Sequence, residues 1–257
     1  MERTNNYLIQ RDLARKHFLN YDQEQIIRKW ALKSDDNWIY TEFLGAGYRI
    51  RRADALVLRE TKAPAGDRQE DVQENDLRKC DVQENDLRKC DAQENDLRKC
   101  DARENDLPAD MTEAGFEEVL SIFDLLCHTE EKPYPAGTFA PVNSLKGRPA
   151  IAVSENIHRQ YAAFPDRDPD GYCRACEMLG GRRISLGDIG YEFCVFQDLK
   201  LRLKFYHSDD EFPAQLICFW DEHALDYVFY ETTFYIAGFL FKAVIGNMPQ
   251  DHEMSVS

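Results

Sequence analysis

A ten-residue sequence is repeated in tandem near the middle of the chain, and it limits where a compact fold can form. Asp71–Cys80 reads DVQENDLRKC, Asp81–Cys90 is identical to it, and Asp91–Cys100 differs only in Ala92. A truncated fourth copy, DARENDL, ends at Leu107. Ten residues turn a helix by about 1000°, which is about 80° short of three full turns. The repeated leucines would therefore spiral around a helix and could not form one buried stripe.

We predict that residues 67–110 form a solvated insert, flexible or partly helical, because acidic side chains outnumber basic ones there by 15 to 8. Residues 1–66 and 111–248 would then make one domain, followed by a tail over residues 249–257. The alternative is an ordered solenoid of pentapeptide coils. We disfavour it because about two coils are too few to bury a core of their own.

Three cysteines, Cys80, Cys90 and Cys100, recur with the repeat. Thiolates on a flexible segment could converge on one soft metal ion or take part in redox chemistry. The alternative is passive copying, since any residue of the founding unit would recur equally. We favour copying because the spacing matches no zinc or iron–sulfur ligand pattern.

The charge balance restricts the possible partners. The chain of 257 residues has 47 acidic and 32 basic side chains and a net charge of -15, while 43% of its residues are hydrophobic, enough for a sizeable core. Nucleic acid and anionic membranes attract positive surfaces, so we expect neither as a partner. The N-terminus lacks the basic-then-apolar order of a secretory signal, and the most apolar stretch, Phe234–Ile245, is too short to span a bilayer. We expect a cytoplasmic protein.

Hydrophobic periodicity outside the repeat predicts an α+β fold: N-terminal helices and a hairpin, central helices, an antiparallel sheet meander and a closing C-terminal helix. Strict alternation over Leu199–Phe205 places Leu199, Leu201, Leu203 and Phe205 on the buried face of one strand. The other elements are expected as helices over residues 6–33 with Asp22 as an N-cap, a hairpin over 38–51, a helix capped by Thr112, helices from near Ser154 and through Cys176, strands over 191–196 and 214–220, and a helix over 231–245.

Three C-terminal segments resemble the closing pattern of a known family. They are DDEFP at Asp209–Pro213, LICFWD at Leu216–Asp221 and YVFYE at Tyr227–Glu231. The pattern is similar to that of the domain of unknown function 3786 family, and the resemblance covers most of Thr112–Ile245 and, more weakly, the N-terminal helices and hairpin. The decapeptide repeat is an extra insert foreign to it.

Members of that family occur mainly in anaerobic bacteria and archaea, and some relatives carry an added iron–sulfur cysteine segment that this chain lacks. The resemblance implies an α+β fold and an accessory role in anaerobic metabolism, and it supplies no activity.

Four acidic residues near the predicted strand ends, Asp210, Glu211, Asp221 and Glu231, are candidate ligand-binding residues. Carboxylates converging there could hold a cation or act as an acid–base pair, in a pocket lined by aromatic side chains. The alternative, which we favour, is structural: aspartates cap turns, and a glutamate stabilises the start of a helix.

Cys173 and Cys176 form a C-x-x-C pair near a predicted helix start, where the helix dipole would favour a thiolate. They are candidates for redox chemistry or metal binding. Zinc would need two more ligands, for which Cys194, Cys218 and His128 are available. The alternative, again favoured, is that both cysteines pack in the core.

The sequence contains no H-E-x-x-H or G-x-S-x-G motif, and it identifies no catalytic residue. It requires no cofactor, although a metal ion is compatible with it. We therefore expect a binding protein rather than an enzyme: an accessory protein that binds a small ligand, a metal or a protein partner. Two alternatives remain open, a thiol redox or thiolate–metal protein using Cys173 and Cys176, and an interaction scaffold using the acidic repeat.

Overall fold

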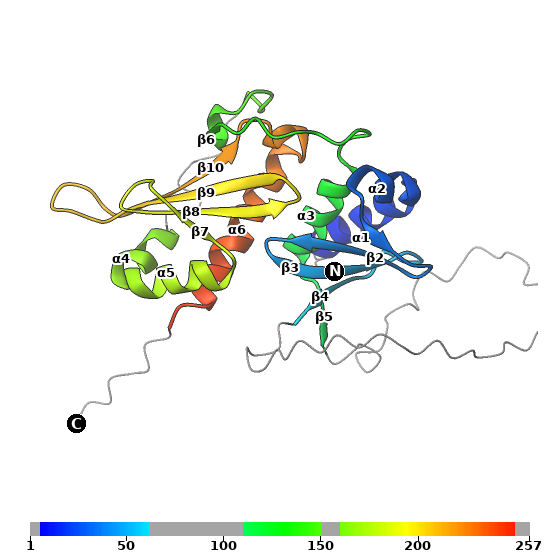
Figure 1. Cartoon of the computed structure of the whole chain (residues 1–257), viewed down its shortest axis with the longest axis horizontal. Coiled ribbons are helices and arrows are strands. Elements are labelled where there is room, and N and C mark those ends of the chain that lie inside the picture. Colours follow the sequence, from blue (N-terminus) through cyan, green and yellow to red (C-terminus); the bar gives the residue numbers. More distant parts are fainter. Residues whose placement is uncertain (1–5, 62–109, 151–159, 250–257) are drawn as a thin grey trace, which may run out of the picture. The chain divides into compact units, whose positions relative to one another are not determined.

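The structure is a computed structural model that describes residues 6–61, 110–150 and 160–249 (Figure 1). Its internal contacts divide the chain into two units, Met1–Glu60 together with Thr112–Ser257, and Thr61–Met111. The predicted insert over residues 67–110, with Cys80, Cys90 and Cys100, lies outside the described residues except for Asp110. The form of the insert, the domain boundaries and the tail therefore remain predictions.

The α+β class is confirmed, because the described residues contain six α-helices and two antiparallel sheets. The helices are α1 (Asn6–Leu19), α2 (Gln23–Trp30), α3 (Phe116–Cys127), α4 (Ala163–Arg167), α5 (Pro169–Met178) and α6 (Tyr230–Gly246). Within the described ranges, no helix is both long enough and apolar enough to cross a membrane.

Each sheet has five strands. The first has the order β1 (Lys33–Ser34), β2 (Trp38–Phe43), β3 (Ala46–Arg51), β4 (Val57–Glu60) and β5 (Met111–Glu113). The second has the order β6 (Phe139–Pro141), β10 (Gln215–Asp221), β9 (Leu199–Tyr206), β8 (Ile189–Phe196) and β7 (Arg182–Ile184). The predicted hairpin is β2–β3 and the predicted meander is β8–β9–β10. The short strands β1, β4, β5, β6 and β7 were not predicted.

Helix starts follow the local capping chemistry of the sequence. The Asp22 carboxylate accepts hydrogen bonds from the amides of Glu24 (3.0 Å) and Gln25 (3.2 Å), as the sequence predicts for an N-cap. The prediction that Thr112 caps α3 is wrong, since Thr112 lies in β5 and the cap is Gly115. The Gly115 amide donates to Glu118 Oε2 at 2.6 Å, so the carboxylate of the first turn satisfies an amide that the helix leaves unpaired.

The same glutamate connects α3 to the first sheet. The Tyr48 hydroxyl donates to Glu118 Oε1 at 2.6 Å, and Arg59 Nη1 lies 3.4 Å from that oxygen. Burial raises the pKa of Tyr48, and the Glu118 charge raises it further, so the hydroxyl keeps its proton and remains a donor. A buried carboxylate is tolerated here because each of its oxygens has a partner.

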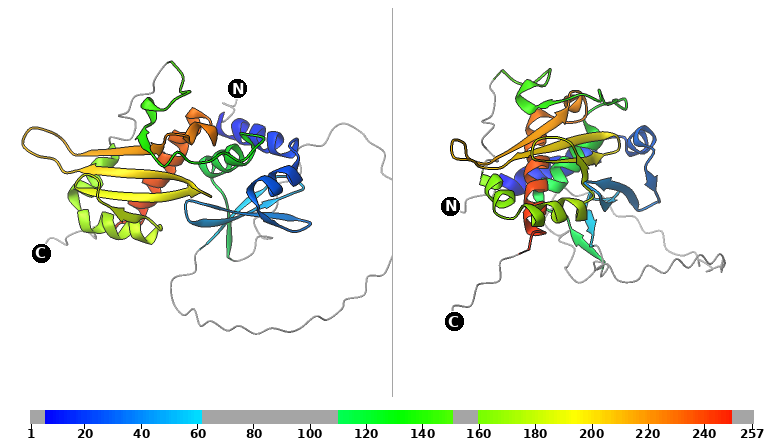
Figure 2. Two further views of the ribbon diagram at one scale, coloured as in Figure 1. Left: turned by 45° about the horizontal axis from the view of Figure 1, so that its top comes forward. Right: turned by 60° about the vertical axis from the view of Figure 1, so that its left-hand side comes forward.

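The second sheet buries the face that strand alternation predicts. Leu199, Leu201, Leu203 and Phe205 are fully buried, while Lys200 between them is exposed. Helices α5 and α6 lie on one side of this sheet (Figure 2). The Tyr172 ring of α5 stands 6.1 Å from the ring of Phe205, which fixes the helix against β9.

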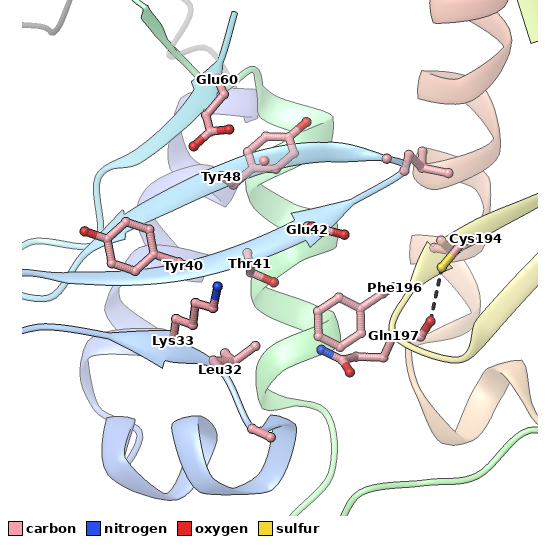
Figure 3. A pocket seen from close by; sticks show the side chains of 15 residues that line it. Leu32, Lys33, Tyr40, Thr41, Glu42, Tyr48, Glu60, Cys194, Phe196 and Gln197 are labelled. Atoms are coloured by element: carbon pink, nitrogen blue, oxygen red, sulfur yellow. Dashed lines mark hydrogen bonds between the residues drawn. The ribbon is translucent and has the colours of Figure 1, made fainter. Parts of the chain in front are cut away.

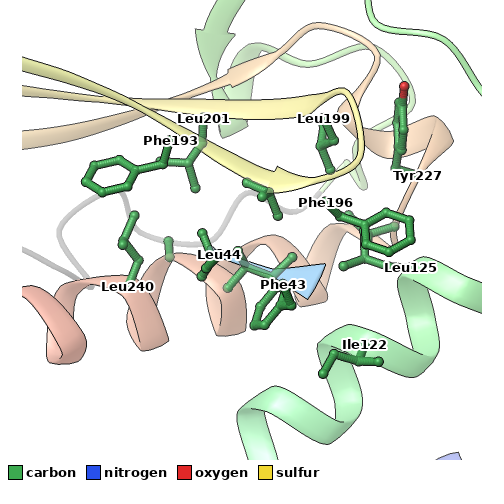
Figure 4. Packing of buried hydrophobic residues seen from close by; sticks show 14 of the residues in the cluster. Phe43, Leu44, Ile122, Leu125, Phe193, Phe196, Leu199, Leu201, Tyr227 and Leu240 are labelled. Carbon is green, nitrogen blue, oxygen red and sulfur yellow. The ribbon is translucent and has the colours of Figure 1, made fainter. Parts of the chain in front are cut away.

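The tip of the β2–β3 hairpin joins the two sheets. Phe43 and Leu44 lie between α6 and strands β8 and β9 (Figure 4), and the Phe43 ring is 5.9 Å from that of Phe239. The Leu44 amide donates to the Val195 carbonyl at 2.9 Å. Leu44 has a left-handed backbone with φ of 48°, which costs roughly 1–2 kcal/mol for a residue with a Cβ. Burying a leucine side chain contributes about 1.5–3 kcal/mol, so packing outweighs the backbone cost.

A buried carboxylate stabilises the other face of the second sheet. Glu192 of β8 is 5% exposed, and it accepts hydrogen bonds from Arg182 (2.8 Å), Lys200 (3.2 Å) and Arg202 (2.9 Å). Burial alone would raise the pKa of Glu192, but the hydrogen bonds from the three cations outweigh it and lower the pKa to about 2. Each strand next to β8 supplies at least one of these cations.

Replacing Glu192 tests this arrangement through pH. The folded-state pKa is lower than the ordinary value of 4.5, so the stabilisation is complete above that value and is lost as the pH falls through about 2. We expect Glu192→Gln to lower the free energy of unfolding by about 1–2 kcal/mol at neutral pH, a figure reduced for screening of the exposed cations. In urea titrations the difference from the parent chain should shrink as the pH falls. A difference that is constant with pH, or equal to that of the exposed control Glu131→Gln, would contradict the assignment.

Candidate functional site

A cleft of about 610 Å³ lies where the first sheet meets the turn between β8 and β9 (Figure 3). One wall comes from the segment after α2 and from β2, β3 and the end of β4. The other wall is Cys194–Gln197. The volume is within the range of sites that hold small organic ligands.

The backbone around this cleft is unusual. Ala31, Leu44, Gly45 and Gln197 all line it, and they have positive φ values of 51°, 48°, 72° and 53°. Ala31 ends α2, Leu44-Gly45 is the two-residue turn of the β2–β3 hairpin, and Gln197 begins the turn from β8 to β9. Such conformations are costly for residues with a Cβ and tend to cluster at functional sites.

One polar group in the cleft wall has no hydrogen-bond partner among the residues that the structure describes. The Thr41 residue is 7% exposed, and its Oγ1 atom has no hydrogen-bond partner within the part of the chain that the structure describes. An unsatisfied buried hydroxyl costs roughly 1–3 kcal/mol. Figure 3 shows Thr41 on β2, on the side toward Lys33 and Phe196. Because the oxygen itself is buried, a molecule in the cleft reaches it only if the Thr41 side chain turns toward the cleft.

Two carboxylates border the cleft on either side of a glycine. Glu42 is the cross-strand partner of Gly47, and a Cβ atom added to Gly47 would collide with the carboxylate of Glu60. Arg49 Nη2 lies 3.6 Å from Glu60 Oε1, and Lys33 is exposed on β1. The Glu60 carboxylate thus occupies the space beside Gly47 that a side chain would otherwise fill, and together with Glu42 it makes this border of the cleft negative.

The thiol in the cleft is protonated at neutral pH. Cys194 Sγ lies 3.1 Å from the Gln197 carbonyl and donates to it (Figure 3). Desolvation of the sulfur raises the pKa of Cys194. Lys200 opposes this shift, and the charges of Glu42 and Asp198 add to it. Cys194 is therefore a hydrogen-bonding group of the wall.

The four acidic residues predicted to bind a ligand lie elsewhere. Asp210 and Glu211 are exposed in the turn from β9 to β10, where the Asp209 carboxylate accepts hydrogen bonds from the amides of Glu211 (2.8 Å) and Phe212 (2.7 Å). Glu231 is exposed in the first turn of α6. These positions are those of the structural alternative, turn and helix-start chemistry.

Asp221 is 1% exposed at the far end of β10, and its carboxylate accepts hydrogen bonds from three amides: Ala136 (2.8 Å), Gly137 (2.8 Å) and His223 (2.9 Å). The strand rise places about 20 Å between it and Gln215 at the other end of β10, beyond which Glu211 lies. The structure does not bring Asp221 and Glu211 together. Across residues 6–61, 110–150 and 160–249, no group of three or more His, Cys, Asp or Glu side chains is arranged to hold a metal.

The structure does bring Cys173 and Cys176 together on α5, three residues apart. Cys176 is 0% exposed, and burial raises its pKa to about 12. Cys173 is partly exposed, and its sulfur accepts a hydrogen bond from Arg183 Nη1 at 2.9 Å. The further zinc ligands considered from the sequence, Cys194, Cys218 and His128, do not group with this pair in the described residues.

Sequence reasoning did not identify Thr41, Glu42 or Glu60 as site residues. The sequence feature that could have pointed to this cleft is the segment Gly45-Ala-Gly47, which we assigned to turn geometry alone. Gly45 does supply the turn, since its φ is 72°. Gly47 lies within β3, where a glycine in a strand leaves room for a close approach.

The fold defines an α+β protein whose two antiparallel sheets share one hydrophobic cluster. Residues 93–243 match the family described as Domain of unknown function (DUF3786), and the chain belongs to this family. The match begins within the third copy of the repeat and ends in α6, so it includes Cys194–Gln197 but not the wall of the cleft supplied by residues 31–60. No curated protein matches the chain. No solved structure matches it either.

Replacing Asp221 tests whether this residue has a structural role or a ligand-binding role. Asp221→Ala removes the buried acceptor of three amides, and we expect it to lower the free energy of unfolding by about 3 kcal/mol. Asp210→Ala, in the exposed turn, should change it by less than about 0.5 kcal/mol. Both values come from chemical denaturation followed by tryptophan fluorescence. Equal stability of the two variants would refute the structural role of Asp221.

Proposed function

We propose that this chain is a cytoplasmic accessory protein that binds a small organic ligand in the cleft between the first sheet and the β8–β9 turn. The observation that carries this proposal is the buried Thr41 hydroxyl, which has no partner within the described residues and lies in the wall of the cleft. A fold retains such a group when something else satisfies it, and a bound molecule is one such partner.

The walls indicate the chemistry of the ligand. Leu32, Leu44 and Phe196 supply apolar contact, and Glu42 and Glu60 supply acceptors at the rim. A molecule with an apolar body and an ammonium group or several donors is complementary to these walls. A carboxylate-bearing ligand would be repelled by both glutamates.

The cleft supports ligand binding better than the acidic residues that the sequence suggested. Asp221 already has three amide donors, and Asp210, Glu211 and Glu231 are solvent-exposed at separate turns. By contrast, Glu42 and Glu60 lie on the same sheet on either side of Gly47. The scaffold alternative depends on residues 67–110, which lie outside the described residues except for Asp110.

The test uses three probes of one shape: phenethylamine, 2-phenylethanol and phenylacetate. Each is titrated into the 15N-labelled full chain and followed by amide chemical shifts. We expect the amine to shift the amides of residues 41–47 and 194–197, the alcohol to bind more weakly, and the carboxylate to bind least. The order follows from the charges of Glu42 and Glu60.

Matched variants separate the site from general charge effects. Glu42→Gln and Glu60→Gln should each weaken amine binding about tenfold, which corresponds to about 1.4 kcal/mol, a size expected for a charge-assisted hydrogen bond. Glu222→Gln, an exposed glutamate outside the cleft, should leave it unchanged. Phenylacetate binding as tightly as phenethylamine, or shifts confined to other parts of the chain, would overturn the proposal.

A further inference from the structure

We propose that Cys173 and Cys176 act as a dithiol that small-molecule disulfides oxidise reversibly to an intramolecular disulfide. This inference concerns α5 and β7 and is independent of ligand binding in the cleft. It rests on three features of the described residues: the spacing of the two thiols, the cation that contacts one of them, and the burial of the other.

Helix geometry places the two cysteines close to each other. Both lie inside α5, three residues apart on one face. The rise and radius of an α-helix put their Cα atoms about 5 Å apart. A disulfide requires a Cα separation of roughly 4.4–6.8 Å, which the pair meets, and a Cβ separation of roughly 3.5–4.5 Å, whereas residues three apart on a helix have Cβ atoms about 5–6 Å apart. This turn of α5 must therefore tighten for the bond to form. Both cysteines are free thiols in the structure.

A fixed cation contacts the more accessible thiol. Arg183 of β7 donates from Nη1 to Cys173 Sγ at 2.9 Å, and its Nη2 lies 3.4 Å from the Asp188 carbonyl. The guanidinium carbon also stands 5.2 Å from the centre of the Tyr191 ring. Reactive cysteines are partly exposed and have a cation beside the sulfur, as Cys173 has here.

Two of the carboxylates near the pair, those of Glu177 and Asp188, have hydrogen-bond partners of their own. Glu177, four residues after Cys173 on α5, accepts a hydrogen bond from the Tyr191 hydroxyl at 3.1 Å. The Asp188 carboxylate accepts one from the His207 amide at 2.9 Å. Asp170 lies three residues before Cys173 in the first turn of the helix. Among the described residues, the charged group that contacts the Cys173 sulfur directly is the Arg183 guanidinium.

The second thiol is protected and has its own polar neighbour. Cys176 is fully buried, so it cannot meet a disulfide from solvent. Tyr172 is 2% exposed, and its hydroxyl has no hydrogen-bond partner of good geometry among the described residues. Burial raises the pKa of Cys176, and the Tyr172 hydroxyl acts in the opposite direction. The Tyr172 hydroxyl is therefore a polar neighbour of Cys176 on the buried side of α5.

The two steps balance in atoms and electrons. The Cys173 thiolate attacks one sulfur of the small disulfide RSSR, the S–S bond breaks, and RS⁻ leaves with the electron pair. The Cys176 sulfur then attacks Cys173 of the mixed disulfide, and a second RS⁻ leaves. The protons of the two protein thiols end on the two released thiols. The protein loses two electrons, and RSSR gains them to become two RSH. Excess RSH reverses both steps.

Glutathione disulfide is the probe, applied to the reduced full-length chain. Trypsin cleaves after Arg167, Arg174 and Arg182, which places Cys173 and Cys176 in separate peptides, residues 168–174 and 175–182. We expect mass spectrometry of an alkylated digest to show these peptides joined by a disulfide. The exposed Cys194 of the same molecule should react at least about tenfold more slowly than Cys173.

Variants distinguish the two thiols. Cys176→Ala should stop the reaction at a glutathione adduct on residues 168–174, and Cys173→Ala should leave Cys176 unmodified. Arg183 is a positioning residue: Arg183→Gln should slow the first exchange about tenfold, and Arg183→Lys should restore most of the rate. Circular dichroism of each variant reports whether α5 and the sheets remain folded.

Three results would overturn the proposal. The first is that the joined peptides are absent under conditions in which Cys194 is already glutathionylated. The second is that Cys173 reacts no faster than Cys194. The third is that Cys176→Ala releases as much glutathione as the parent chain. An unchanged rate in folded Arg183→Gln would remove Arg183 from the mechanism. None of these measurements depends on whether the cleft binds phenethylamine.

Discussion

The insertion of the β2–β3 hairpin tip beside α6 and β8 is the interaction on which the rest of the structure depends. Phe43 and Leu44 are buried there, and the Leu44 amide bonds to the Val195 carbonyl. The contact makes one hydrophobic cluster from two separate sheets. It also forms the cleft, because Leu44 and Val195 both line it. A leucine in a left-handed turn is tolerated at this position because its side chain is buried.

Buried polar groups in this protein differ in how well they are satisfied. Glu118, Glu192 and Asp221 each have at least three partners, and those partners come from different segments of the chain. They stabilise the fold because a paired buried carboxylate holds its neighbours in place. The hydroxyls of Thr41 and Tyr172 have no such partners in the described residues, and each lies beside a group with its own chemistry, the cleft or the Cys173–Cys176 pair. Function is proposed at two of the places in the described residues where a buried polar atom lacks a hydrogen-bond partner.

The sequence predicted those elements that short-range patterns determine. Alternation over Leu199–Phe205 gave the buried face of β9, and Asp22 gave the start of α2. The strands β1, β4, β5, β6 and β7 have two to four residues, too few to show a period. Their formation depends on a neighbouring strand, which local sequence does not specify.

The candidate site was less predictable than the fold. The sequence suggested acidic residues near strand ends as ligand-binding residues. In the structure, the Asp221 carboxylate accepts hydrogen bonds from backbone amides, and the length of β10 separates it from the turn that contains Asp210. The cleft combines residues 31–60 with residues 194–197, and only the docking of the hairpin brings these segments together. The C-x-x-C pair was visible in the sequence, but its contact with Arg183 depends on the packing of α5 against β7.

Hydrogen exchange of the Leu44 amide, followed residue by residue by NMR, tests the central claim most directly. If the hairpin tip is held by the Val195 carbonyl and packed against α6, this amide should exchange as slowly as the amides of β9 in the core. Exchange as fast as that of the exposed Asp209–Phe212 turn would contradict the account, because the tip would then be open to solvent and the cleft would lose its common wall.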